Sequence, residues 1–130
     1  MSEELLTLLT SSLEAYDAII IAEDKNTYIH GVIDAVQKVN EKYLLPIYIA
    51  KTTSQLARLK QKLDATALRT FYILDNKYTI EENEPKGQEL IEQWQLENDC
   101  VMITSSYFDM RDQKLPYPVF DKLMPEFDLC

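Results

Sequence analysis

Apolar residues follow two different patterns along this chain. In some stretches they recur every three or four positions, which predicts amphipathic helices. These stretches are Met1–Tyr16, Asn26–Tyr43, Thr52–Leu63 and Gly87–Glu97. In others they form short uninterrupted runs, which is typical of strands buried on both faces. The strands predicted from these runs are Ile19–Ala22, Pro46–Ala50, Leu68–Leu74 (with its apolar run at Phe71–Leu74) and Val101–Thr104. Strands that alternate with helices predict a doubly wound, mostly parallel α/β sheet, preceded by an extra N-terminal helix.

The C-terminal part of the chain is less regular. Tyr107–Lys114 is short and polar, and Leu115–Pro118 (LPYP) fits either a brief fifth strand or an extended turn. Proline cannot donate to a strand ladder, so the residues alone leave both alternatives open. Phe120–Met124 predicts a last short helix that Pro125 ends. The sheet is therefore expected to have four to five strands.

Composition narrows the class of protein. The 130 residues fit a single domain, and a hydrophobic fraction of 46% is enough for a buried core. The formal net charge of −9 disfavours nucleic acids and anionic membranes as partners, and favours cations or proteins with basic patches. No run approaches the length of a membrane span, and the N-terminus lacks the basic start of a secretion signal. We therefore expect a cytoplasmic protein.

Several kinds of chemistry are disfavoured by what the chain lacks. Cys100 and Cys130 are its two cysteines and His30 is its one histidine, so neither a disulfide framework nor a zinc site is expected. Its two glycines, Gly31 and Gly87, belong to no glycine-rich phosphate loop. Nucleotide-binding P-loops and dinucleotide folds are thereby excluded.

Polar side chains stand where three of the predicted strands end. Glu23 and Asp24 follow the first run, Asp75 follows the third, and Thr104 and Ser105 end the fourth. Ligands of open α/β sheets collect at the carboxyl ends of the strands, so these side chains are expected to lie together. Clustered carboxylates suit a hard cation such as Mg²⁺ with a phosphoryl group beside it. In the plainer interpretation, these residues cap the loops and helices that follow the strands.

This order of motifs resembles the receiver domain of two-component response regulators, over about Asp17 to Met124. The segments that carry the resemblance are Ile19–Asp24 (IIIAED), Phe71–Asp75 (FYILD), Met102–Ser105 (MITS), Gly87–Gln93 (GQELIEQ) and Leu115–Phe120 (LPYPVF). The resemblance implies a flavodoxin-like fold with Asp75 as phosphoacceptor. It implies a switch hydroxyl on Thr104, followed by the small residue Ser105. It also implies Mg²⁺ held by Glu23, Asp24 and Asp75.

The chain departs from the receiver pattern in its second half. Tyr117 stands before Pro118 where receivers have a phosphate-binding lysine, and Lys114 is the nearest substitute. The loop after Asp75 is extended by Glu81–Glu84, and the segment between Thr104 and Tyr117 is too short for a full helix and strand. These departures indicate an atypical or degenerate receiver.

Three functions remain open at this point. The leading one is a stand-alone signalling module of a phosphorelay, in which a histidine kinase or phosphotransfer protein phosphorylates Asp75 and a downstream protein reads the output. The first alternative is a pseudo-receiver that works as a phosphorylation-independent interaction or dimerisation scaffold. A remote alternative is a small Mg²⁺-dependent phosphohydrolase, although the residues favour a protein that is not an enzyme. The leucine stripe of Met1–Tyr16 either packs on its own domain or pairs with a second copy, which would give a homodimer.

Overall fold

The computed structural model describes residues 3–24, 26–78, 83–105 and 107–121. Its five strands form one all-parallel sheet in the order β2-β1-β3-β4-β5. The strands are β1 (Ala18–Ala22), β2 (Ile47–Ala50), β3 (Thr70–Leu74), β4 (Cys100–Thr104) and β5 (Val119–Asp121). The helices are α1 (Glu3–Ser12), α2 (Asn26–Tyr43), α3 (Thr53–Ala65), α4 (Gly87–Trp94) and α5 (Tyr107–Met110). Two 3₁₀ turns, η1 (Leu13–Ala15) and η2 (Arg111–Gln113), extend α1 and α5.

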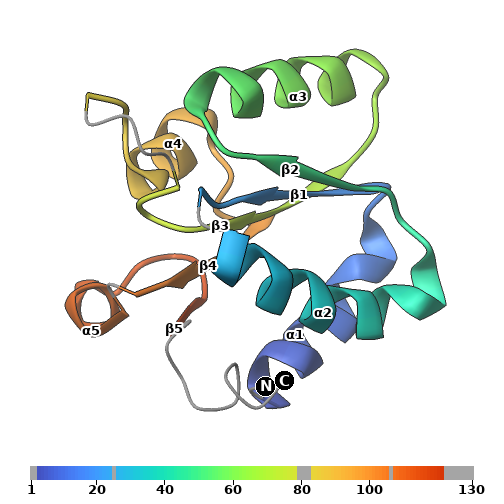
Figure 1. Cartoon of the computed structure of the whole chain (residues 1–130), viewed down its shortest axis with the longest axis horizontal. Coiled ribbons are helices and arrows are strands. Elements are labelled where there is room, and N and C mark those ends of the chain that lie inside the picture. The colour runs from blue at the N-terminus through green and yellow to red at the C-terminus, as the bar shows by residue number, and fades with distance from the viewer. Residues whose placement is uncertain (1–2, 25, 79–82, 106, 122–130) are drawn as a thin grey trace.

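Helices cover both faces of the sheet, as Figure 1 shows. The helices α3 and α4 lie on one face, and α1 and α2 lie on the other. Successive strand side chains point to opposite faces, so each strand feeds two cores. In β1, Ile20 belongs to the α3/α4 core, whereas Ile19 and Ile21 belong to the α1/α2 core. The predicted doubly wound, flavodoxin-like α/β fold with an additional N-terminal helix is confirmed.

The three central strands explain the uninterrupted apolar runs of the sequence. Every residue of β1, β3 and β4 is buried, because helices cover both sides of the sheet. The edge strand β2 is more exposed, and only Ala50 is fully buried there. The apolar runs of the sequence therefore predict the central strands more clearly than the edge strand β2.

The leucine stripe of the N-terminal helix packs inside the protomer. The side chains of Leu5, Leu9 and Leu13 are all 0% exposed and belong to the α1/α2 core. This decides between the two interpretations of the stripe in favour of packing on its own domain. A dimer contact would have to use a surface other than the buried side chains of Leu5, Leu9 and Leu13.

A polar network at the amino ends of the strands holds the end of the N-terminal helical segment. The Tyr16 hydroxyl donates to Asp99 Oδ1 at 2.7 Å, and the Arg69 guanidinium lies 4.7 Å from the Tyr16 ring centroid. The Arg69 backbone N–H donates to Asp17 Oδ2 at 3.0 Å. Burial, followed by the hydrogen bond to Asp99, raises the pKa of Tyr16 well above its ordinary value. The network thus joins the residue that follows η1 to residues that precede β1, β3 and β4.

The C-terminal part decides between two open alternatives and corrects one prediction. Leu115–Pro118 is a turn, and the fifth strand is Val119–Asp121. Phe120 and Asp121 therefore lie in a strand, and the predicted helix Phe120–Met124 is wrong at its start; its remainder lies outside the described residues. Pro118 still contributes to pairing, because its carbonyl accepts a 3.0 Å hydrogen bond from the Met102 N–H. Proline lacks a donor and keeps its acceptor, which is why the ladder begins at its carbonyl.

The fourth helix is shorter than the sequence predicts. It ends at Trp94 because Gln95 adopts a left-handed conformation with φ 57°. Trp94 is half-buried, and the Lys60 ammonium lies 5.8 Å from its ring centroid. Trp94 therefore packs against the edge of the α3/α4 core and is not fully enclosed by it.

Candidate functional site at the carboxyl edge of the sheet

The candidate site lies where the sheet topology changes direction. The chain moves from β1 outward to β2, then crosses back to β3 on the other side of β1. Ligand sites of open α/β sheets lie at such a switch point, outside the carboxyl ends of the strands. At this switch point β1 pairs with β3, and Ala22 lies opposite Leu74. Glu23 and Asp75, the residues that follow, therefore leave the sheet side by side.

Backbone hydrogen bonds fix these two residues to the sheet. The Asp75 N–H donates to the Ala22 carbonyl at 3.1 Å, and the Glu23 N–H donates to the Ala50 carbonyl at 3.1 Å. The carboxylates thus occupy positions that continue the strands and do not belong to free loops. Rigid placement of this kind is what a preorganised site requires.

The candidate residues differ in burial. Glu23, Asp75 and Thr104 are 3%, 5% and 1% exposed, whereas Asp24 is half-buried and Ser105 is exposed. Thr104 ends β4 and is therefore brought to the same edge as the carboxylates. Ser105 faces solvent and is the least enclosed of the predicted set.

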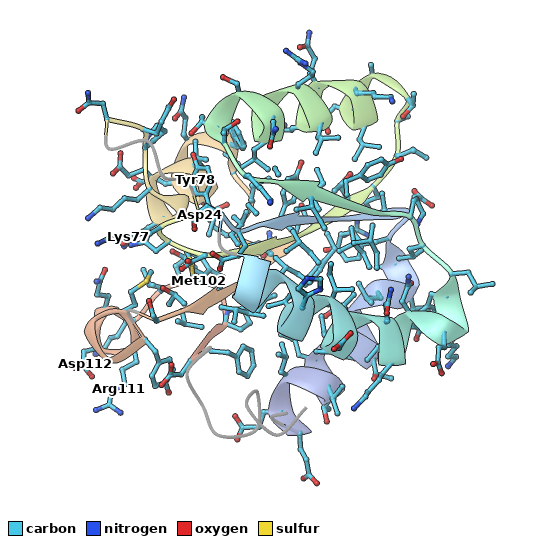
Figure 2. The ribbon with its side chains drawn as sticks, viewed as in Figure 1. Asp24, Lys77, Tyr78, Met102, Arg111 and Asp112 are labelled. Atoms are coloured by element: carbon cyan, nitrogen blue, oxygen red, sulfur yellow. The ribbon has the colours of Figure 1, made fainter. Side chains whose placement is uncertain are left out.

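The acidic pair after β1 has one oxygen that could take a ligand. Glu23 Oε1 accepts a hydrogen bond from the Asp24 N–H at 3.1 Å. Asp24 Oδ1 is buried and accepts no hydrogen bond from the residues that the structure describes. A buried carboxylate oxygen is costly without a partner, so this atom suits a cation or a donor group. Figure 2 shows Asp24 at the same end of the sheet as Lys77 and Tyr78.

The fit of Mg²⁺ to this edge is partial. Within residues 3–24, 26–78, 83–105 and 107–121, no three His, Cys, Asp or Glu side chains form a group that could hold a metal ion. Oxygen ligands of the right chemistry are present in Glu23, Asp24 and Asp75, and Mg²⁺ commonly binds through one or two carboxylates together with water. The predicted magnesium site stays a prediction.

The residue after Asp75 fastens the loop that follows. The Asn76 carbonyl accepts a 2.9 Å hydrogen bond from the Gly87 N–H, and Asn76 Oδ1 accepts a 3.0 Å bond from the Gln88 N–H. Asn76 therefore caps the start of α4 from across the loop, a role that Ser, Thr, Asp or Asn ordinarily performs from the adjacent position. Sequence reasoning missed Asn76, because a cap eleven residues before the first residue of its helix leaves no local signal.

Tyr78 is a second residue that the sequence did not reveal. Its side chain is 0% exposed, and its hydroxyl lies 2.5 Å from Thr53 Oγ1 in the first turn of α3. An aromatic residue in an otherwise polar loop was the one available signal. Tyr78 thus anchors the loop after Asp75 to α3. Of the acidic insertion Glu81–Glu84, residues 81 and 82 lie outside the described part, and Glu84 is half-buried.

Tyr117, the residue compared with the receiver lysine, does not lie at the carboxyl edge of the sheet. Tyr117 precedes β5, at the amino end of that strand, and its side chain belongs to the α3/α4 core. Burial, followed by the charges of Cys100 and Glu92, raises the pKa of Tyr117 to about 12. The comparison of Tyr117 with a lysine at the carboxyl edge was therefore wrong. Lys114 is exposed and adopts a left-handed conformation with φ 50°.

Comparisons of the chain with protein-family models, curated proteins and solved structures find no match. No helix in the described residues has the length and apolar character needed to cross a membrane.

Proposed function

We propose that this protein is a receiver-like signalling module that accepts a phosphoryl group on Asp75. The observation that carries the proposal is the placement of Glu23, Asp24, Asp75 and Thr104 at the ends of three adjacent strands, beside the switch point. A histidine kinase or phosphotransfer protein is the proposed donor, and a downstream protein is the proposed reader. We place this activity in the cytoplasm.

In the proposed reaction Asp75 is the nucleophile, and the neighbouring side chains stabilise the phosphoryl group. A carboxylate oxygen of Asp75 forms a bond to phosphorus as the bond to the donor nitrogen breaks, which leaves an acyl phosphate and the free imidazole. Mg²⁺, when bound through Glu23, Asp24 and Asp75, supplies positive charge against the phosphoryl oxygens. The Thr104 hydroxyl donates a hydrogen bond to one of these phosphoryl oxygens. This bond would couple phosphorylation of Asp75 to the end of β4.

The test is phosphorylation by a small donor. The purified protein is incubated with acetyl phosphate and Mg²⁺ and then examined by intact mass spectrometry. We expect one added phosphoryl group in the native protein and in Asp34→Asn, an exposed carboxylate on α2. We expect none in Asp75→Asn. An adduct that survives in Asp75→Asn, or no adduct at all with the fold intact, would refute the assignment of Asp75.

One observation favours the pseudo-receiver alternative. The Asp75 side chain is 5% exposed, which leaves a phosphoryl donor little direct access to it. A pseudo-receiver would bind its partner without chemistry at this edge. It is distinguished by the absence of an adduct together with unchanged NMR spectra in the presence of beryllofluoride. The phosphohydrolase alternative requires sustained release of phosphate from p-nitrophenyl phosphate, with loss of turnover in Asp75→Asn.

A further inference from the structure

A groove lies on the surface between α4 and the turn that leads into β5. Its volume is about 260 Å³. The residues that line it are Gln88, Ile91, Glu92, Glu97, Leu115, Pro116 and Tyr117. Glu23, Asp24, Asp75 and Thr104 are not among them, and only the Gln88 N–H reaches that edge, through its bond to Asn76. The groove is therefore separate from the candidate phosphorylation site.

The floor of the groove is apolar. Ile91 and Tyr117 are buried and Leu115 is half-buried, so their side chains form a continuous hydrophobic wall. The Tyr117 hydroxyl is inaccessible to solvent and makes no hydrogen bond within the described residues, so the tyrosine presents carbon atoms to the groove. A ligand that fits here must bring an aliphatic or aromatic body.

The polar groups of the groove can accept hydrogen bonds but have little to donate. Glu92 is exposed and Glu97 half-buried, and neither forms an ion pair with a residue that the structure describes. Gln88 Nε2 donates one of its two hydrogens to Gln113 Oε1 at 2.8 Å, which leaves one amide hydrogen and the side-chain carbonyl oxygen. Lys114 is exposed and is not among the lining residues. The two carboxylates therefore favour an occupant that donates hydrogen bonds and carries positive charge.

We propose that this groove binds a Lys or Arg side chain of a partner protein. The aliphatic stem would pack on Leu115, Pro116 and the exposed edge of Tyr117, and the charged head would lie against Glu92 and Glu97. Long basic side chains combine these two kinds of contact. The volume is below the range of about 300–1,000 Å³ that is usual for ligand pockets, so a single side chain fits better than a cofactor. The net charge of −9 also favours a basic partner.

The first test is an NMR titration with two capped dipeptides, acetyl-Leu-Arg-amide and acetyl-Leu-Gln-amide. We expect the arginine peptide to shift the backbone signals of α4 and of residues 115–117, with a weaker effect at high salt. Equal shifts from the glutamine peptide would refute the charged head group, and no shifts from the arginine peptide would refute the site. The proposal does not depend on Asp75, so Asp75→Asn should bind the arginine peptide with unchanged affinity.

The second test locates the charge. In Glu92→Gln/Glu97→Gln we expect the dissociation constant of the arginine peptide to rise about five- to tenfold. The matched control, Glu14→Gln/Glu41→Gln, removes two exposed carboxylates outside the groove lining and so makes the same change in net charge. An equal loss of affinity in the control would show that only the overall charge attracts the peptide, and would overturn the proposed groove.

Discussion

The backbone oxygen of Asp75 lies 2.6 Å from the position that a Cβ atom would take on Gly87. The start of α4 therefore touches the main chain of the proposed phosphoacceptor, and it can do so because residue 87 has no side chain. Since Cβ contacts closer than 3.0 Å are essentially never seen, and the opposing atom belongs to the backbone, a larger residue must displace one of the two segments.

Substitution of Gly87 should therefore destabilise the protein. We expect Gly87→Ala to lower the free energy of unfolding by about 1–3 kcal/mol, because overpacking against the Asp75 carbonyl outweighs the better helix propensity of alanine. Urea denaturation followed by circular dichroism measures the effect. Gly31→Ala is the control, since nothing lies within 4 Å of a Cβ built there. That variant should be stabilised by about 0.5–1 kcal/mol, and equal effects of the two substitutions would contradict the packing argument.

The contact between Thr53 and Tyr78 should couple α3 to the loop after Asp75. We expect Tyr78→Phe to cost about 0.5–1.5 kcal/mol, because the ring stays buried while the hydroxyl contact is lost. Thr53→Ala should lower the free energy of unfolding by less in the Tyr78→Phe variant than in the native protein. A double-mutant cycle measures this coupling energy, and strictly additive effects would mean that the hydrogen bond contributes nothing to stability.

The buried hydroxyl of Tyr117 should be dispensable at neutral pH. It makes no hydrogen bond in the described part of the chain, so Tyr117→Phe should leave stability unchanged or raise it by up to about 1 kcal/mol. A loss well beyond 1 kcal/mol would show that the hydroxyl has a partner. Tyr16→Phe is the comparison, because it removes the 2.7 Å bond to Asp99 and should be destabilising.

The same residue should affect stability at alkaline pH. The folded-state pKa of Tyr117 is about 12, above its ordinary value of 10.0, so folding favours the neutral phenol. Its contribution to stability is fully present below pH 10 and is lost as the pH rises toward 12, because the unfolded chain releases this proton first. Unfolding free energies measured from pH 8 to pH 11.5 should fall less steeply in Tyr117→Phe than in the native protein. Parallel curves would contradict the raised pKa.

The leucine stripe of α1 should matter for folding and not for self-association. Leu9 is 0% exposed, and Leu9→Ala should cost about 2–5 kcal/mol through lost burial and a cavity in the α1/α2 core. Leu44→Ala is a suitable control, since Leu44 is 82% exposed and should change stability by less than about 0.5 kcal/mol. Sedimentation velocity should show the same oligomeric state for both variants. A change of state in Leu9→Ala alone would point to an intermolecular role for the stripe.

The sequence was most informative where burial is complete. The limits of α2 agree with prediction, and the central strands were recognised because short apolar runs that alternate with helical patterns are typical of buried parallel strands. The carboxyl-edge positions of Glu23, Asp75 and Thr104 also followed, since parallel strands bring their ends together. The roles of Asn76 and Gly87 did not follow. Both depend on contacts across a loop, which leave no periodic trace in the residues between them.

The segment around β5 was predicted least well, because its strand is short and lies beside prolines. A three-residue strand such as β5 has too few positions to show a pattern, and the prolines beside it favour a turn. The segment Leu115–Phe120 was compared with the fifth-strand motif of receivers, and the structure begins the fifth strand only at Val119, near the end of that segment.

The docking of α1 also has a consequence for the order in which the chain folds. The Tyr16 hydroxyl bonds to Asp99, 83 residues away, and the leucines of α1 share a core with Val101 and Ile103 of β4. On the ribosome, α1 emerges well before β4, so part of its binding surface is made only when β4 has been synthesised. A chain dominated by such distant contacts folds more slowly than one built from local contacts. Until β4 arrives, the leucine face of α1 is a hydrophobic surface open to chaperones and to aggregation.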